Sequence, residues 1–115
     1  MQLRDPGLLR NEAHIDGAWI GSAATFAVRN PASGETLAHV PDLDAAATRR
    51  AIEAANRAWP AWRQKTGKER AAVLRRWFEL ITANVDDLAL IMTSEQGKPL
   101  PEAKGEVAYG ASFVE

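Results

Sequence analysis

The side chains of this sequence that could do chemistry are four serines, two histidines and a set of carboxylates. No serine lies in a Gly-x-Ser-x-Gly turn, the arrangement that presents a nucleophilic hydroxyl to a base. His14 and His39 fall in strand-like segments, and no third ligand at a helical spacing supports a metal between them, so we interpret both as structural or solvent-facing. The absence of cysteine excludes a thiolate zinc site and a cysteine nucleophile within these residues.

Paired carboxylates are a second candidate for chemistry. Glu102 and Glu106 are four residues apart and share one helix face, with Lys104 to one side. Nothing else that acid–base catalysis requires is near them in the sequence, so we interpret all three as surface charge. The glycine patterns that cradle phosphates are absent. The sequence therefore predicts no catalytic, cofactor-binding or metal-ligating residue in this chain.

Basic and aromatic side chains have both a binding and a structural interpretation. The arginine pairs at residues 49–50 and 75–76 could contact phosphates, but carboxylates lie close by and we interpret them as solvated helix faces. Lys98 could reach an anion, yet it also suits the C-terminal cap of a helix. Trp59 and Trp62 could stack on a base or a sugar, and we interpret them as core or interface packing of a helix corner.

Length and charge limit the classes of protein that fit. A chain of 115 residues can form one modest core, and a net charge of −1 argues against a dedicated nucleic-acid binder. The longest uncharged stretch, residues 17–28, is too short to span a bilayer, and the N-terminus has no apolar run of signal-peptide length. We therefore expect a soluble cytoplasmic protein that binds neither nucleic acid nor a membrane.

The elements that would position these side chains begin after an N-terminal arm, residues 1–12. Residues 13–40 carry strand and turn signals: Asp16-Gly17 is typical of a hairpin, and Asn30-Pro31 begins a second turn. We expect short antiparallel strands in this segment.

Residues 41–115 carry a helical period. Asp44 suits an N-cap, Pro60 is expected to stop or bend the first helix, and Thr66 with Glu69 fits a capping box before the second. The apolar face of the first helix is expected at Thr48, Ile52, Ala55 and Trp59. That of the second is expected at Leu74, Trp77, Phe78 and Ile81.

Two further helices complete the segment. The third is expected from about Asp86, with Leu88, Ile91 and Met92 inward, and ends at Gly97 in a left-handed cap. The fourth begins near Pro101, and its apolar stripe is formed by Ala103, Val107, Ala111 and Val114. Gly105 and Gly110 lower the stability of this helix, which suggests close approach of another backbone. Because the stripe still runs at Glu115, we expect a longer polypeptide.

These patterns predict an α+β chain, with short N-terminal antiparallel strands followed by about four helices. Residues 1–12, 13–40 and 41–115 would together form an incomplete N-terminal part of one larger domain.

Five pieces of the sequence, in order, resemble the start of aldehyde dehydrogenases. They are Ile15-Asp16-Gly17-Ala18-Trp19, Asn30-Pro31-Ala32-Ser33-Gly34-Glu35, Ala58-Trp59-Pro60-Ala61-Trp62, Lys68-Glu69-Arg70 with Leu74-Arg75, and Glu95-Gln96-Gly97-Lys98-Pro99. Within that family, residues 95–99 followed by 102–107 and 109–115 are most similar to succinate-semialdehyde dehydrogenases. The resemblance extends from about residue 8 to the end of the chain.

The resemblance implies the N-terminal part of an α/β aldehyde dehydrogenase fold. It implies a full-length, homo-oligomeric enzyme that oxidises succinate semialdehyde to succinate through a thiolate adduct and hydride transfer to NAD or NADP. The catalytic cysteine, the general-base glutamate and most cofactor contacts of the family lie beyond the matched segment, so this segment alone is expected to be inactive and to bind no cofactor. Some relatives hold a monovalent cation near the equivalents of Val28, Arg29 and Glu106, which makes Glu106 a suggested ligand.

Two other interpretations stay open. A small non-catalytic helical module could present Trp59, Trp62 or Trp77 to a partner. A dehydrogenase of the same family could also act on another aldehyde, because the substrate-pocket residues lie mostly outside this sequence.

Overall fold

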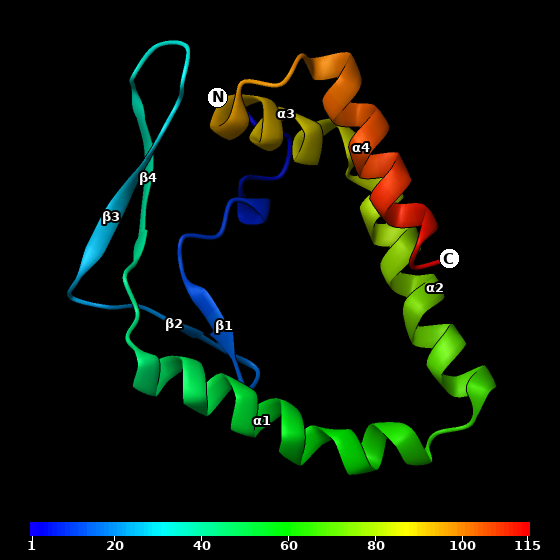
Figure 1. The fold of residues 1–115 in the computed structure, drawn as a ribbon. Helices are drawn as coiled ribbons and strands as arrows, with labels where there is room; N and C mark the ends of the chain where they lie inside the picture. The colour runs from blue at the N-terminus through cyan, green and yellow to red at the C-terminus, as the bar shows by residue number, and fades with distance from the viewer.

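The computed structural model describes residues 1–115, and it confirms an α+β chain with four helices. A 3₁₀ turn, Pro6–Leu8, is followed by two hairpins, β1 (Ala13–Ile15) with β2 (Ala18–Ile20) and β3 (Thr25–Arg29) with β4 (Thr36–Pro41). The helices are α1 (Ala45–Gln64), α2 (Gly67–Ala83), α3 (Val85–Gln96) and α4 (Leu100–Ser112). Figure 1 shows an open frame, in which α1 connects the hairpins on one side to α2, α3 and α4 on the other.

The two hairpins form where the turn residues predict them. Asp16 and Gly17 both have positive φ, 54° and 77°, as a two-residue turn requires if its twist is to match that of the flanking strands. In the second hairpin the Asn30 side chain accepts a hydrogen bond from the Ala32 N–H at 2.9 Å, and Gly34 takes φ 74°. Each hairpin is a separate two-stranded sheet.

The first helix differs from a simple amphipathic helix at Pro60 and in the residues that it buries. Asp44 caps α1 as predicted, accepting from the Ala47 N–H at 2.8 Å. Pro60, however, does not stop the helix, which continues to Gln64; proline removes one N–H donor, and the residues after it still form the last turn. The expected apolar face of α1 is not covered within residues 1–115, where the buried side chains of this helix are Ala47 and Ala54. The four residues of the expected face are all exposed: Thr48, Ile52, Ala55 and Trp59.

The ends of α2 and α3 follow the predicted caps. Thr66 and Glu69 form the complete capping box at the start of α2. Gly97 ends α3 in the left-handed region with φ 79°. α4 begins at Leu100, so Pro101 lies in its first turn.

The core of the chain is small and lies where α3 and α4 meet. Ala89 and Ala103 are fully buried and Val107 nearly so, with half-buried side chains of α2 and α3 around them. Ala103, Val107 and Ala111 of the predicted stripe are buried on α4, whereas Val114, its fourth member, lies beyond the end of the helix and is half-buried. Leu88, Ile91 and Met92 of α3 are half-buried, and two of them, Leu88 and Met92, pack on this cluster.

Most of the large apolar side chains remain exposed. Only 9 of 115 residues are buried, and no large side chain is fully buried. The accessible surface is 8125 Å², whereas a compact protein of this mass exposes about 6,200 Å². The radius of gyration is 16.6 Å, against about 13 Å for a compact chain of this length. Residues 1–115 therefore leave about 2,000 Å² more surface open than a self-contained domain does.

The exposed apolar residues include two of the four residues of the predicted stripe of α2. Trp77 is 55% exposed and Leu74 37% exposed, while Phe78 and Ile81 are half-buried. Apart from the flanking residues and the backbone of α4 itself, no heavy atom lies within 4 Å of the position that a Cβ would take at Gly105 or Gly110. The expected close approach is therefore not made by another element of residues 1–115. None of the helices is both long enough and apolar enough to cross a membrane.

Candidate functional site

The two histidines lie on different hairpins. His14 is on β1 and His39 is on β4, and both are exposed, as the sequence predicts. His14 stacks edge-on against Trp19, with ring centroids 5.1 Å apart. No group of three or more histidine and acidic side chains is placed to hold a metal ion.

The two carboxylates of α4 differ: Glu106 forms an ion pair, and Glu102 forms none. Glu106 pairs with Lys98, so the amine of Lys98 is engaged. Lys104 instead reaches Asp86 on α3 at 2.7 Å. Val28 and Arg29 lie on β3, where Arg29 donates to the Gly34 carbonyl at 3.2 Å. A cation site that uses Glu106 stays a prediction.

The arginine pairs are solvated, as expected. All four arginines are exposed: Arg49, Arg50, Arg75 and Arg76. Arg75 pairs with Glu115 at 2.8 Å and lies over the ring of Phe78, and Arg76 pairs with Glu79 at 3.3 Å. These ion pairs are exposed, so they contribute little to stability.

The tryptophans around Pro60 are not packed as a helix corner within these residues. Trp59 is 55% exposed and Trp62 is half-buried. Neither tryptophan stacks on another aromatic ring.

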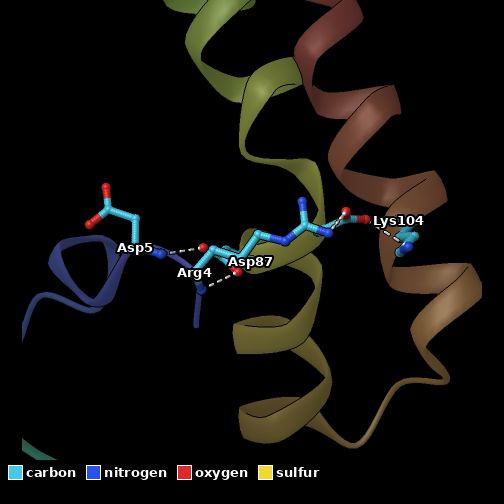
Figure 2. Close-up of polar contacts among 5 residues, drawn as sticks. Arg4, Asp5, Asp87 and Lys104 are labelled. Atoms are coloured by element: carbon cyan, nitrogen blue, oxygen red, sulfur yellow. Dashed lines mark hydrogen bonds and ion pairs between the residues drawn. The ribbon is translucent and has the colours of Figure 1, made fainter. Parts of the chain in front are cut away.

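A polar cluster that the sequence analysis does not predict joins the N-terminal arm to α3. Asp87 accepts hydrogen bonds from the backbone N–H groups of Arg4, at 3.0 Å, and Asp5, at 2.8 Å (Figure 2). Its neighbour Asp86 pairs with the Arg4 guanidinium at 3.2 Å and with Lys104 at 2.7 Å. Asp87 is only 6% exposed. The one signal for this cluster in the sequence is that Asp87 lies next to Leu88, an inward position of α3.

Both aspartates are held in their ionised form. The backbone N–H donors of Arg4 and then Asp5 lower the pKa of Asp87, because they stabilise the charged carboxylate. The hydrogen bond and the charge of Lys104 lower the pKa of Asp86. Carboxylates of this kind accept hydrogen bonds but do not donate protons near neutral pH. The cluster can therefore hold chain segments together, and it is not suited to general acid catalysis.

The hollows of the surface carry no catalytic arrangement. One of about 440 Å³ lies beside the start of α1, lined by Ser22, Asp42, Asp44 and Arg50 among others. Another, of about 390 Å³, lies between α2 and α4 and is mainly apolar, lined by Phe78, Ile81, Val85, Val107 and Ala111 among others. Neither brings a nucleophile together with a base.

Comparison with known proteins agrees with the fold and the capping motifs. Residues 19–115 match the aldehyde dehydrogenase family, and the chain belongs to this family. It is 60% identical to glutarate-semialdehyde dehydrogenase of Pseudomonas aeruginosa and 54% identical to an NADP-dependent succinate-semialdehyde dehydrogenase of Escherichia coli. Each alignment covers 100% of this chain and 24% of the relative. The chain thus spans about a quarter of the length of these curated relatives.

Solved structures of aldehyde dehydrogenases superpose closely on this chain. The succinate-semialdehyde dehydrogenase of Burkholderia pseudomallei superposes with a TM-score of 0.95 and 62% sequence identity, over 98% of this chain and 24% of that one. An aldehyde dehydrogenase of Brucella melitensis superposes with a TM-score of 0.97 and 53% identity. The hairpins and the four helices are therefore the N-terminal part of an aldehyde dehydrogenase fold.

Proposed function

We propose that residues 1–115 are the N-terminal segment of an NAD(P)-dependent succinate-semialdehyde dehydrogenase, which oxidises succinate semialdehyde to succinate. The observation that carries the proposal is the alignment of the whole chain with dehydrogenases of this kind, at 54% and 62% identity. A cytoplasmic location and homo-oligomeric assembly, both expected from the sequence and its resemblance, belong to the same proposal.

A second candidate substrate is glutarate semialdehyde. Two Pseudomonas relatives with that name are 60% and 59% identical to this chain. The two substrates differ by one methylene, and both are short aldehydes with a distal carboxylate. A relative named 3-sulfolactaldehyde dehydrogenase, 51% identical, has a sulfonate in its substrate. The names of these relatives support a short aldehyde with an anionic end as the substrate of the complete protein.

We propose that residues 1–115 do not themselves bind the nicotinamide dinucleotide. Such a site needs a glycine-rich turn that leads from a strand to a free helix N-terminus, where the pyrophosphate binds. The connection from β4 to α1 instead carries Asp42 and Asp44, and the Asp44 carboxylate already occupies the N-terminus of α1. We therefore assign the cofactor and the catalytic groups to the rest of the polypeptide.

The open surface supports a scaffold role for this segment. About 2,000 Å² more surface is exposed than a compact protein of this mass would leave. That excess is comparable with a large protein–protein interface. The apolar faces of α1 and α2 would be covered by the rest of a longer polypeptide.

The size of the natural polypeptide tests the proposal first. The protein is captured from its source cells with an antibody to residues 44–97, and its intact mass is measured. We expect a species several-fold heavier than 12.5 kDa. A stable species at 12.5 kDa would reject the proposal and favour a small non-catalytic helical module that binds a partner.

Activity of the captured protein then tests the substrate. Purified polypeptide is assayed with succinate semialdehyde and with glutarate semialdehyde, each with NAD and with NADP, and the carboxylate product is identified. We expect the larger kcat/KM with succinate semialdehyde, and a larger value with glutarate semialdehyde selects the second candidate. The 115-residue chain is the matched control, and oxidation of either aldehyde by that chain alone contradicts the scaffold role.

A further inference from the structure

The N-terminal arm has little of its own to hold it in place. It pairs with no strand, and its one regular element is the three-residue turn Pro6–Leu8. No side chain of residues 1–12 is buried, and the apolar ones are at best half-buried. The arm nevertheless lies against α3, more than 80 residues away in the sequence (Figure 1).

Asp87 provides the bonds that explain this placement. Asp87 is only 6% exposed as a residue, so its carboxylate requires hydrogen-bond donors from the protein. Both donors come from the arm, as the N–H groups of Arg4 and Asp5 at 3.0 and 2.8 Å (Figure 2). Because the donors are backbone groups, the bonds depend on the path of the arm and not on its side chains.

Asp86 makes a different kind of contact. It is 41% exposed, and its partners Arg4 and Lys104 are 82% and 45% exposed. Solvent screens ion pairs of this exposure, and long side chains lose entropy when they form them. Asp86 therefore offers a matched comparison: the same residue type, one position away, with the same arm residue among its partners.

We propose that Asp87 is a latch, whose carboxylate binds the Arg4 and Asp5 N–H groups and straps the N-terminal arm to the α3–α4 helix pair. The strap joins the beginning of the chain to the far side of the open frame, at the end opposite the connection from α1 to α2 (Figure 1). Without the latch, the arm is free while α3 and α4 keep their mutual packing.

Amide hydrogen exchange in the complete polypeptide tests the latch. Asp87→Asn keeps the size of the side chain but removes its charge and one acceptor oxygen. We expect the Arg4 and Asp5 amides to exchange on the order of tenfold faster in this variant, as the loss of hydrogen bonds to a charged group predicts. Asp86→Asn should change the same amides by less than about threefold. The amides of α3 serve as the internal reference for folding.

A deletion of residues 1–9 distinguishes two effects of Asp87→Asn, the loss of the contact with the arm and a general destabilisation of α3. In the complete polypeptide, Asp87→Asn should lower the thermal midpoint, and in the deletion background it should leave the midpoint unchanged. If Asp87→Asn folds only when the arm is absent, the latch is supported too. Equal losses with and without the arm, failure to fold in both backgrounds, or equal exchange of the arm in the Asp86 and Asp87 variants would overturn it.

Discussion

Asp87 shows how one side chain can resolve a conflict between charge and burial. An aspartate on the inward side of a helix is costly unless donors reach it. The chain supplies these donors from residues 4 and 5, at the other end of the sequence. No local pattern encodes such a contact, because helix caps and periodicity relate residues only a few positions apart.

The lowered pKa of Asp87 predicts a specific dependence of stability on pH. A carboxyl whose pKa is lower in the folded than in the unfolded state, here below its ordinary 3.8, stabilises the fold above the ordinary value. That contribution is lost as the pH falls through the lowered pKa. Asp87→Asn lacks it at every pH. The difference in thermal midpoint between wild type and variant should therefore be constant at neutral pH and shrink below about pH 3.8.

Carboxylates far from Asp87 contribute equally to wild type and variant, whereas Asp86 is coupled to Asp87 by charge repulsion. The groups that face Asp87 are the N–H donors of the arm, the Arg4 guanidinium and Asp86. Thermal midpoints of the complete polypeptide, measured across acid and neutral pH, provide the check. A midpoint difference that stays unchanged down to the lowest pH would contradict the assignment of charge to Asp87.

Gly97 is a residue whose identity is required by its backbone conformation. It has φ 79°, and a Cβ there would lie 3.0 Å from the Cγ of Pro31. We expect Gly97→Ala to destabilise the fold by about 1–2 kcal/mol, from the left-handed backbone alone. Gly67→Ala is the control, because its Cβ would meet no atom within 4 Å and its φ is not positive. Chemical denaturation of the complete polypeptide measures both, and equal effects of the two substitutions would refute the argument.

At the scale of elements, local signals predicted the ends of helices and strands well. The hairpin at Asp16-Gly17, the capping box at Thr66 and the left-handed cap at Gly97 all form as expected. Each depends on residues within a few positions of one another, so the sequence carries the whole signal. Of the two outcomes expected at Pro60, a stop or a bend, the stop does not occur, because near the end of a helix the loss of one N–H donor does not prevent a last turn.

Which face of a helix is covered could not be predicted in the same way. Ile52 and Trp59 lie on the face of α1 that periodicity predicts to be apolar. Within residues 1–115, however, the buried side chains of α1 are Ala47 and Ala54. Periodicity identifies an apolar face but not the element that covers it.

The absence of a catalytic residue in residues 1–115 is a prediction from motifs alone, and it stays a prediction until the activity of the 115-residue chain is measured.

The capping box gives a prediction for α2. The Thr66 hydroxyl accepts from the Glu69 N–H, and the Glu69 carboxylate accepts from both the N–H and the hydroxyl of Thr66. These bonds lower the pKa of Glu69. Thr66→Ala should cost about 1 kcal/mol of stability, as the loss of an N-cap usually does. Thr82→Ala, a threonine change in the same helix away from the cap, should cost less in the same denaturation experiment; an equal cost would show that the cap contributes nothing.

Gly105 gives a prediction that distinguishes the segment from the complete polypeptide. Alanine in the middle of α4 should stabilise the helix of the 115-residue chain by about 1 kcal/mol, because nothing lies near its Cβ. In the complete polypeptide we expect the opposite sign, since a glycine there suggests close approach of another backbone. Circular dichroism of the chain and thermal midpoints of the complete polypeptide measure the two effects. Stabilisation in both would mean that no backbone approaches α4.

At the scale of the whole molecule, the dominant feature is unsatisfied apolar surface. Trp59 and Trp77 are each 55% exposed, on α1 and α2, and no core of comparable size compensates for them. Exposed patches of this extent mark surfaces that are covered by another part of a protein or by a partner. The two explanations differ in what the complete polypeptide shows in solution.

Oxidative footprinting of individual tryptophans distinguishes them. In the 115-residue chain we expect Trp77 to react nearly as fast as in the urea-unfolded chain, and the chain to bind a hydrophobic dye and unfold without a sharp transition. In the complete polypeptide the same tryptophan should react much more slowly, because the rest of the protein covers α2. Mass spectrometry locates the oxidised residue in both samples. If Trp77 is equally reactive in both, the α2 face is free in the natural protein, and a partner-binding role for that face becomes the better explanation of its exposure.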